Sequence, residues 1–189
     1  MNEFLLTEKY RPKKVSDTIL PKEIKATLQG FVDKGDVSNL IFAGKPGTGK
    51  TTAARAMLDE IGCDYILING SMEGRQIDTL RNEIANFASS MSFTGKRKYV
   101  IIDECDGLPI LVQEALRAFV EHYAKNCGFI FSCNYLNKLI PAMFSRTGLI
   151  KFEIPKEEKQ ELAGQFFKRL TQICKQENIE ADPKVLGQL

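Results

Sequence analysis

The sequence predicts an α/β protein in which a five-stranded parallel sheet lies between layers of helices. Short apolar runs, rich in β-branched and aromatic side chains, alternate with segments of helical periodicity over most of the chain. These runs are nearly continuous instead of alternating apolar with polar residues, which is typical of strands buried on both faces of a parallel sheet. The order strand, helix, strand, helix is typical of three-layer α/β domains.

Five strands and four helices are expected in this first part of the chain. The predicted strands are residues 39–43, 65–68, 99–102, 128–133 and 149–152. The predicted helices are residues 50–61, 76–91, 110–124 and 138–144.

The pattern changes after Pro155. Residues 156–178 contain no strand signal and carry apolar side chains at helical spacing, with charged side chains on the other face. Near the last residue, Asp182 and Pro183 match a helix N-cap followed by proline at the first helical position. We therefore predict two units: an α/β domain over residues 1–155 and the incomplete opening of an all-α domain over residues 156–189.

Composition excludes several classes of protein. The 189 residues are 43% hydrophobic and 26% charged, values typical of folded globular proteins and not of disordered or collagen-like chains. No apolar run approaches the ~20 residues that span a membrane, and the first residues do not resemble a signal peptide. Lys and Arg total 26 against 24 Asp and Glu, so a nucleic-acid surface must be a local patch. Five cysteines without a CxxC pair exclude a zinc ribbon, and the single histidine, His122, excludes a histidine-rich metal site.

A phosphate-binding motif follows the first predicted strand and opens the first predicted helix. Residues 44–51 match the P-loop pattern G-x-x-x-x-G-K-[ST] at each position. Its glycines let backbone N–H groups approach phosphate oxygens, and the helix N-terminus adds positive potential. Lys50 would reach the β- and γ-phosphates of ATP, and the Thr51 hydroxyl would bind Mg²⁺. The nucleotide-binding residues predicted here are Gly44, Lys45, Pro46, Gly47, Thr48, Gly49, Lys50, Thr51 and Thr52.

Two acidic residues end the third predicted strand. At the carboxyl edge of a parallel sheet, where ligands bind, Asp103 would hold Mg²⁺ and Glu104 would act as general base on the attacking water. Alone, such a pair is equally compatible with acids that cap a following helix. The P-loop upstream favours the catalytic interpretation.

Two further polar residues are candidates at strand ends. Asn134 closes the fourth strand and could align the attacking water, although asparagine is also a common turn residue there. Arg146 precedes the last strand and could stabilise charge on the transferred phosphate. Alone, a solvated side chain is the simpler interpretation of Arg146.

Six stretches resemble the clamp-loader ATPases of the AAA+ superfamily, of the replication factor C small-subunit type and of the large ATPase subunit of T-even-type phage loaders. The stretches are residues 7–12, the P-loop, residues 69–71 with 77–88, residues 103–106, residues 113–117 with Glu121, and residues 133–134. The resemblance implies that Tyr10, Arg11 and Pro12 lie near the adenine. It also implies that Asn134 is sensor 1 and that Arg146 is an arginine finger acting in trans on a neighbouring subunit's nucleotide.

The same resemblance implies that residues 1–155 form the AAA+ nucleotide-binding domain and residues 156–189 part of the helical lid. The sensor-2 arginine and the collar that holds the assembly together are expected beyond residue 189. At the finger, Thr147 stands where the family usually has cysteine. This departure affects the local packing, because the arginine itself is kept.

The function implied is that of an ATPase subunit in a pentamer with other clamp-loader subunits, which opens a ring-shaped sliding clamp and closes it on primer–template DNA. The implied location is the cytoplasm, that of the bacterial host if the gene is phage-encoded, and no membrane partner is expected. Candidate DNA contacts by family analogy are Arg75, Arg81 and Asn82, for which a solvated helix face is equally compatible. Residues 96–98, which are Lys-Arg-Lys, are more typical of a solvated sheet edge than of a DNA patch.

Two alternatives remain open at this point. One is another AAA+ ATPase of replication or repair, such as a helicase loader or a branch-migration motor. The other is an assembly subunit that binds nucleotide without turnover. The clamp-loader-like stretch at residues 8–12, together with Arg146, argues against the first alternative. The second is disfavoured by the intact P-loop and acidic residues, namely Lys50, Thr51, Asp103 and Glu104.

Overall fold

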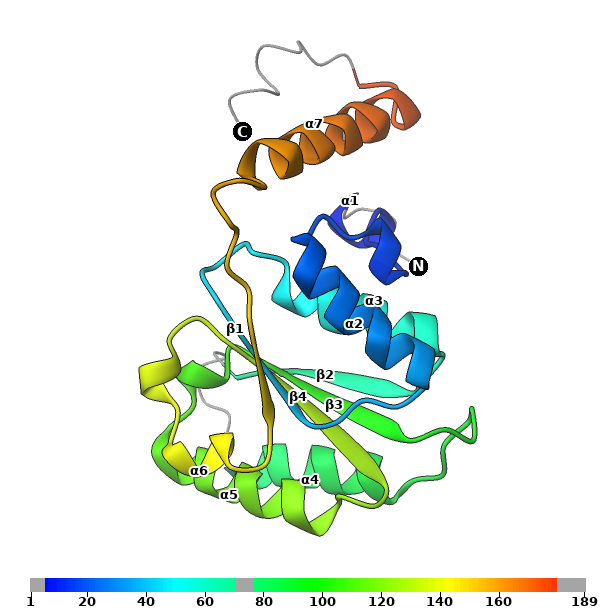
Figure 1. Cartoon of the computed structure of the whole chain (residues 1–189). Coiled ribbons are helices and arrows are strands. Elements are labelled where there is room, and N and C mark those ends of the chain that lie inside the picture. Colours follow the sequence, from blue (N-terminus) through cyan, green and yellow to red (C-terminus); the bar gives the residue numbers. More distant parts are fainter. Residues whose placement is uncertain (1–5, 71–76, 180–189) are drawn as a thin grey trace.

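A computed structural model describes residues 6–70 and 77–179 and has at its centre a five-stranded parallel sheet (Figure 1). The strands are β1 Leu40–Ala43, β2 Tyr65–Asn69, β3 Lys98–Asp103, β4 Cys127–Cys133 and β5 Gly148–Lys151. Their spatial order is β2-β3-β4-β1-β5, and each neighbouring pair is parallel. The predicted α/β class and five-stranded parallel sheet are therefore confirmed.

Helices cover both faces of the sheet (Figure 1). One face carries α2 Lys22–Lys34 and α3 Lys50–Ile61, and the other carries α4 Ile77–Ser89, α5 Ile110–His122 and α6 Pro141–Phe144. Successive strand residues point to opposite faces, so β1 contributes Phe42 to the core under α2 and α3, and Ile41 to the core over α4 and α5. Two buried apolar clusters result, one on each face, and they hold the three layers together.

The segment after β5 leads to the long helix α7 Lys159–Gln176, which lies beside the short N-terminal helix α1 Leu6–Lys9 (Figure 1). Phe152 is buried and its ring packs 4.9 Å from that of Phe42, so the α/β core extends at least to this residue. The division into units at residues 155 and 156 stays a prediction. Asp182 and Pro183 lie outside the described residues.

Polar contacts attach α7 to the rest of the chain at both of its ends. Near its start, the Glu161 carboxylate lies 2.9 Å from the Lys22 ammonium. Just after its end, Glu177 pairs with Lys9 at 2.9 Å and accepts a hydrogen bond from the Tyr10 hydroxyl. These contacts place α7 over the N-terminal segment.

The structure differs from the sequence-based elements in several places. Helix α2 is absent from the prediction, although its buried residues Ile24 and Leu28 have helical spacing. In place of the predicted helix 138–144, the chain forms a 3₁₀ turn, Leu136–Lys138, followed by the short helix α6. Helix α6 starts at Pro141, because proline is favoured at the first helical position. The edge strands β2 and β5 are partly exposed, with Leu67 and Leu149 each 42% accessible, so their apolar runs do not indicate full burial.

Within the described ranges 6–70 and 77–179, no helix has the length and apolar character needed to cross a membrane.

Candidate nucleotide-binding site

The loop between β1 and α3 forms a cradle around the Lys50 side chain. Gly47 and Gly49 have φ values of 76° and 87°, in the left-handed region that favours glycine, and they turn the chain into α3. Lys50 is 8% exposed, and its ammonium donates to the carbonyls of Gly44 at 2.7 Å and Lys45 at 3.0 Å. Burial lowers the pKa of Lys50, and the nearby Asp103 carboxylate opposes that shift. The charge of this lysine is therefore held at a fixed point at the carboxyl edge of the sheet.

Gly44 also joins this loop to the segment that follows β5. A Cβ on Gly44 would lie 2.6 Å from the Phe152 carbonyl oxygen, which is closer than real Cβ contacts allow. Glycine is required here because the two backbones run against each other.

The acidic residues at the end of β3 are connected to the P-loop and to β4. The Thr51 hydroxyl donates a 2.7 Å hydrogen bond to one carboxylate oxygen of Asp103, and the Ser132 hydroxyl donates to the other. Glu104 has φ = 52°, a left-handed conformation that is uncommon for a residue with a side chain. Its backbone N–H donates to the Ser132 hydroxyl oxygen at 3.2 Å. This turn directs Glu104 into the same cavity as Lys50 and Thr51.

Asn134 is held against Lys50 by two groups. Its side-chain oxygen accepts a 2.9 Å hydrogen bond from the Lys50 ammonium. Its backbone N–H donates to the Asp106 carboxylate at 3.2 Å, and the N–H of Tyr135 donates to the other oxygen of that carboxylate at 3.2 Å. The end of β4 is therefore fixed by the acidic loop that follows β3.

Two of the cavities beside the P-loop adjoin each other and differ in polarity. A polar cavity of about 300 Å³ is lined by Pro46, Gly47, Gly49, Lys50, Thr51, Thr52, Asp103, Glu104, Ser132 and Asn134. A more apolar cavity of about 470 Å³ lies between the P-loop, the N-terminal segment and α7, and it includes Tyr10, Pro12, Gly47, Thr48, Gly49, Thr52, Leu162, Phe166, Leu170 and Ile173. The first has the donors and charge that suit phosphates, and the second has the apolar surface that suits a base.

Arg146 lies at the other end of the sheet. Gly148, the first residue of β5, pairs with Leu40, the first residue of β1, whereas the P-loop follows the last residue of β1. At a rise of ~3.3 Å per residue, the two ends of β1 are about 10 Å apart along the strand. The Arg146 guanidinium lies 3.0 Å from the Glu121 carboxylate of α5, and Arg117 lies 3.3 Å from the same oxygen. The structure therefore does not bring Arg146 to the P-loop of its own chain.

Comparison with known proteins identifies the family. Residues 40–158 match the model of the ATPase family associated with various cellular activities, or AAA. The chain belongs to the AAA family of ATPases. Membership of this family implies that the domain binds nucleotide.

Relatives with substantial identity are named for clamp loading. The chain is 39% identical over 191 residues to the sliding-clamp-loader large subunit of Enterobacteria phage T4, covering 99% of this chain and 59% of the relative. It is 40% identical over 188 residues to the replication factor C small subunit of Sulfolobus acidocaldarius, covering 96% of this chain and 56% of the relative. The chain thus spans less than two thirds of the length of these relatives.

The fold also matches solved AAA+ structures. The Thermotoga maritima RuvB Holliday junction branch migration motor superposes with a TM-score of 0.69 at 19% identity, covering 94% of this chain and 58% of that one. At this identity the likeness shows the fold alone.

Within this AAA domain, the other predicted site residues have different positions. Arg11 lines neither cavity of the nucleotide site, and its guanidinium donates to Glu8 and, at 3.3 Å, to Thr52. Arg81 and Asn82 are exposed on α4, across the sheet from α3, and Arg75 lies outside the described residues.

The basic run 96–98 is only partly a solvated edge, because Lys96 is exposed whereas Arg97 is half-buried and Lys98 is buried. Lys98 is 4% exposed and donates to the carbonyls of Phe87 and Ser90 at the end of α4. Arg97 donates to the carbonyls of Ala124 at 2.9 Å and Cys127 at 3.2 Å. These side chains satisfy carbonyl groups at helix and strand ends.

Ser132 and Asp106 are the site residues that the sequence analysis does not predict. Ser132 was detectable as a hydroxyl within an otherwise apolar strand, and Asp106 as the last acid of residues 103–106. Neither pattern indicates that the side chain would fix Asp103 or Asn134.

Proposed function

We propose that this chain is the ATP-binding part of a sliding-clamp-loader subunit, which uses ATP binding and hydrolysis to open a clamp and load it on primer–template DNA. The observation that carries the proposal is 39–40% identity, over nearly the whole chain, to proteins named for this task in a phage and in an archaeon. The proposed site of action is the cytoplasm, that of the host if the gene is phage-encoded.

The polar cavity supports ATP hydrolysis. The Thr51 hydroxyl and the Asp103 carboxylate lie 2.7 Å apart and are oxygen ligands of the kind that Mg²⁺ prefers, so these two residues would hold it. Bound there, Mg²⁺ would neutralise charge on the β- and γ-phosphates. Lys50 would bind the γ-phosphate oxygens in place of the backbone carbonyls that it now contacts. Glu104 would accept the proton of the attacking water, and the Asn134 amide would orient that water.

Arg146 supports an assembly in which neighbouring subunits share a site. It lies at the opposite end of the sheet from its own P-loop, so it can reach a γ-phosphate only on another subunit. The threonine at position 147 is compatible with this role. Its hydroxyl donates a 2.7 Å hydrogen bond to the Met143 carbonyl and so stabilises the turn that carries Arg146.

We assign the clamp contact to the loop between α4 and β3. Among the described residues, Phe93 is 100% exposed and Met91 is 90% exposed, and exposed large apolar side chains mark protein interaction sites. Asp64 holds this loop by accepting 2.8 Å hydrogen bonds from the Ser92 hydroxyl and the Phe93 N–H. A pre-ordered loop loses little conformational freedom on binding. Exposed Arg81 and Asn82 on α4 remain the proposed DNA contacts.

The test is ATP turnover by the full-length subunit with its partner subunits, clamp and primer–template DNA. Glu104→Gln keeps the shape of the side chain and removes the base, so turnover should fall by about 10²-fold or more while ATP still binds. Glu114→Gln, an exposed acid on α5, is the matched control and should keep full turnover. Turnover that does not respond to clamp and DNA would refute the clamp-loading function. Equal turnover by Glu104→Gln and the parent would exclude Glu104 as the base.

A further inference from the structure

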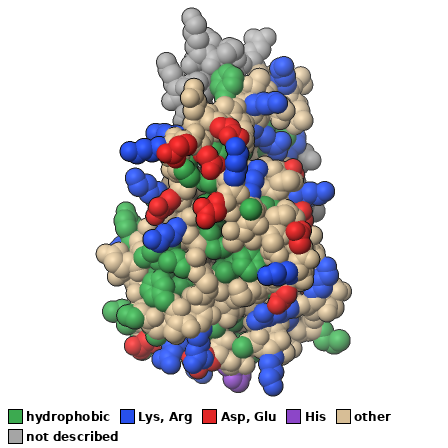
Figure 2. Space-filling view, in the orientation of Figure 1, with side chains coloured by type: hydrophobic (Ala, Val, Ile, Leu, Met, Phe, Trp, Pro, Cys, Tyr) green, Lys and Arg blue, Asp and Glu red, His purple; other side chains and the backbone are tan. Residues whose placement is uncertain are grey.

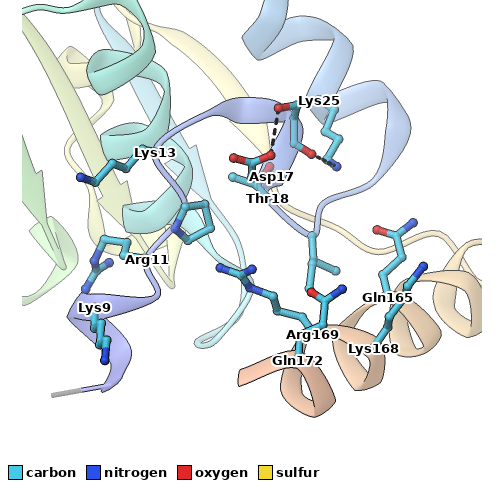
Figure 3. Close-up of a pocket in the computed structure, with 13 residues that line it drawn as sticks. Lys9, Arg11, Lys13, Asp17, Thr18, Lys25, Gln165, Lys168, Arg169 and Gln172 are labelled. Carbon is cyan, nitrogen blue, oxygen red and sulfur yellow. Dashed lines mark hydrogen bonds between the residues drawn. The ribbon is translucent and has the colours of Figure 1, made fainter. Parts of the chain in front are cut away.

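A strongly basic groove lies beside the nucleotide site, between the N-terminal segment, the start of α2 and α7 (Figure 3). It has a volume of about 510 Å³, and none of the P-loop residues 44–51 lines it. It shares a wall with the more apolar cavity of about 470 Å³, called the base cavity below, because Pro12, Thr18 and Arg169 line both. The groove is therefore a neighbour of the nucleotide site and not part of the phosphate cradle.

The charge of this groove differs from that of the rest of the chain. Six basic side chains line it against one acidic side chain, Asp17. The basic residues are Lys9, Arg11, Lys13, Lys25, Lys168 and Arg169. The whole chain has 26 basic and 24 acidic residues, and on the face shown in Figure 2 the two kinds are interspersed. A concentration of one sign in a concave surface attracts ligands of the opposite charge.

Helix α7 presents two different faces to the two cavities. Leu162, Phe166, Leu170 and Ile173 face the base cavity, whereas Gln165, Lys168, Arg169 and Gln172 follow the i, i+3, i+4, i+7 spacing of one helical face along the groove. Arg169 is held in place, because its guanidinium donates a 3.2 Å hydrogen bond to the Tyr10 carbonyl and lies 5.9 Å from the centre of the Tyr10 ring. The basic face of α7 is thus fixed opposite the basic N-terminal segment.

The cations are spread along the groove and do not converge on one point. Figure 3 shows Lys9, Arg11 and Lys13 toward one end, Lys168 toward the other, and Arg169 between them. Two of the six are partly neutralised, since Lys9 pairs with Glu177 and Arg11 with Glu8. Lys13 and Lys168 are exposed, and in the described part of the chain neither forms an ion pair. A row of separated cations suits a chain of linked phosphate groups better than a single anion.

We propose that this groove binds the phosphodiester backbone of a nucleic-acid strand. The site is separate from the contacts proposed on α4, because α4 lies on the opposite face of the sheet from α2 and the groove (Figure 1). It takes backbone phosphates without reading sequence, since its side chains offer charge and N–H donors and no stacked aromatic platform lines it. A strand bound there bridges Lys13 and Lys25 on one side and Lys168 and Arg169 on α7.

The test is binding of a fluorescein-labelled oligothymidylate of about 12 nucleotides to the chain, measured by fluorescence anisotropy over a salt series. The parent should bind with a dissociation constant of roughly 10⁻⁴–10⁻⁶ M. In Lys13→Ala/Lys168→Ala, the slope of log K against log salt should become less steep by about 1.4, because each lost contact with a single strand removes about 0.7. At about 0.1 M salt this corresponds to a loss of roughly 10–30-fold in affinity.

The matched control is Lys34→Ala/Lys125→Ala, which removes the same charge from exposed positions outside the groove and should leave the slope unchanged. The assay needs no ATP and no partner subunit, so its result does not depend on the proposed ATPase cycle. Equal slopes for the groove and control variants would overturn the proposal, as would complete loss of binding in Arg81→Ala alone. Inorganic tripolyphosphate is the second ligand. If it binds through Lys13 and Lys168 while the oligonucleotide does not bind, the assignment to nucleic acid is overturned.

Discussion

Asp106 connects the acidic loop after β3 to the end of β4, and Asp106→Asn tests whether its charge holds Asn134 in place. The carboxylate accepts one hydrogen bond from the backbone N–H of Asn134 and another from that of Tyr135, each 3.2 Å long. Asparagine has a single acceptor oxygen at its side-chain end. Its NH₂ group must therefore face one of these two N–H donors.

The magnitude follows from the exposure of the two donors. The bond to Tyr135 is exposed, so water can replace it, whereas the bond to Asn134 is partly buried. Loss of one charge-assisted bond and weakening of the other should cost about 1–2 kcal/mol. Since each kcal/mol lowers Tm by roughly 2–4 °C at this chain length, Asp106→Asn should melt about 2–8 °C below the parent. Turnover in the assembly should also fall, while ATP affinity changes little because Lys50 and Thr51 are untouched.

Calorimetry of the nucleotide-free chain gives Tm, and equilibrium binding of a labelled ATP analogue gives affinity. Asp33→Asn is the matched control, because Asp33 is exposed on α2 and its carboxylate accepts a hydrogen bond from the Gln29 side chain. A Tm for Asp106→Asn equal to that of the control would refute the role of the charge. Loss of ATP binding together with turnover would show that Asp106 supports the whole site and not Asn134 in particular.

Two other predictions concern the edge of the sheet that carries Arg146. In a full-length assembly, Arg146→Ala should lower stimulated turnover by about 10²–10⁵-fold. Mixing Arg146→Ala subunits with Lys50→Ala subunits should restore part of the turnover, because each variant keeps a different half of a shared site. If the mixture turns over ATP no faster than either variant alone, action in trans is contradicted. Glu121→Gln should lower kcat and leave the KM for ATP unchanged, since Glu121 orients Arg146 at 3.0 Å and lies away from the P-loop. An unchanged kcat would show that this exposed ion pair does not position the arginine.

The positions of the residues proposed to carry phosphate chemistry were predictable from the sequence, because their spacing follows from local geometry. A strand, a glycine-rich loop and a helix N-terminus place Lys50 and Thr51 without help from the rest of the chain, and parallel strands bring Asp103 and Asn134 to the same edge. Residues 40–43, 65–69 and 127–133 form strands close to the predicted bounds for the same reason. These are features in which a short segment determines its own structure.

The remaining features depend on contacts between distant segments. Lys98 has a charged side chain, yet it is buried because its ammonium donates hydrogen bonds to the carbonyls of Phe87 and Ser90 at the end of helix α4. Ser132 contributes to the site because β4 lies beside β3 and presents its hydroxyl to Asp103. The basic groove requires α7 to fold back onto the N-terminal segment, more than 100 residues away in sequence. No local pattern carries this information.

The position of Arg146 has a consequence for assembly that follows from the parallel sheet. All strands end at the edge that holds Lys50 and Asp103, so a residue that precedes a strand, as Arg146 precedes β5, lies at the opposite edge. If Arg146 completes a neighbour's site, one subunit must present its amino edge to the carboxyl edge of the next. Such a contact is heterologous and repeats head to tail, so it builds a ring or a helix and not a two-fold dimer. Each interface then contains Glu121 of one subunit, beside Arg146, and Glu104 of the next. The ion pair with Glu121 would hold the Arg146 guanidinium in position until a neighbour's nucleotide binds. The phosphate of that nucleotide would then be the second anion beside Arg146.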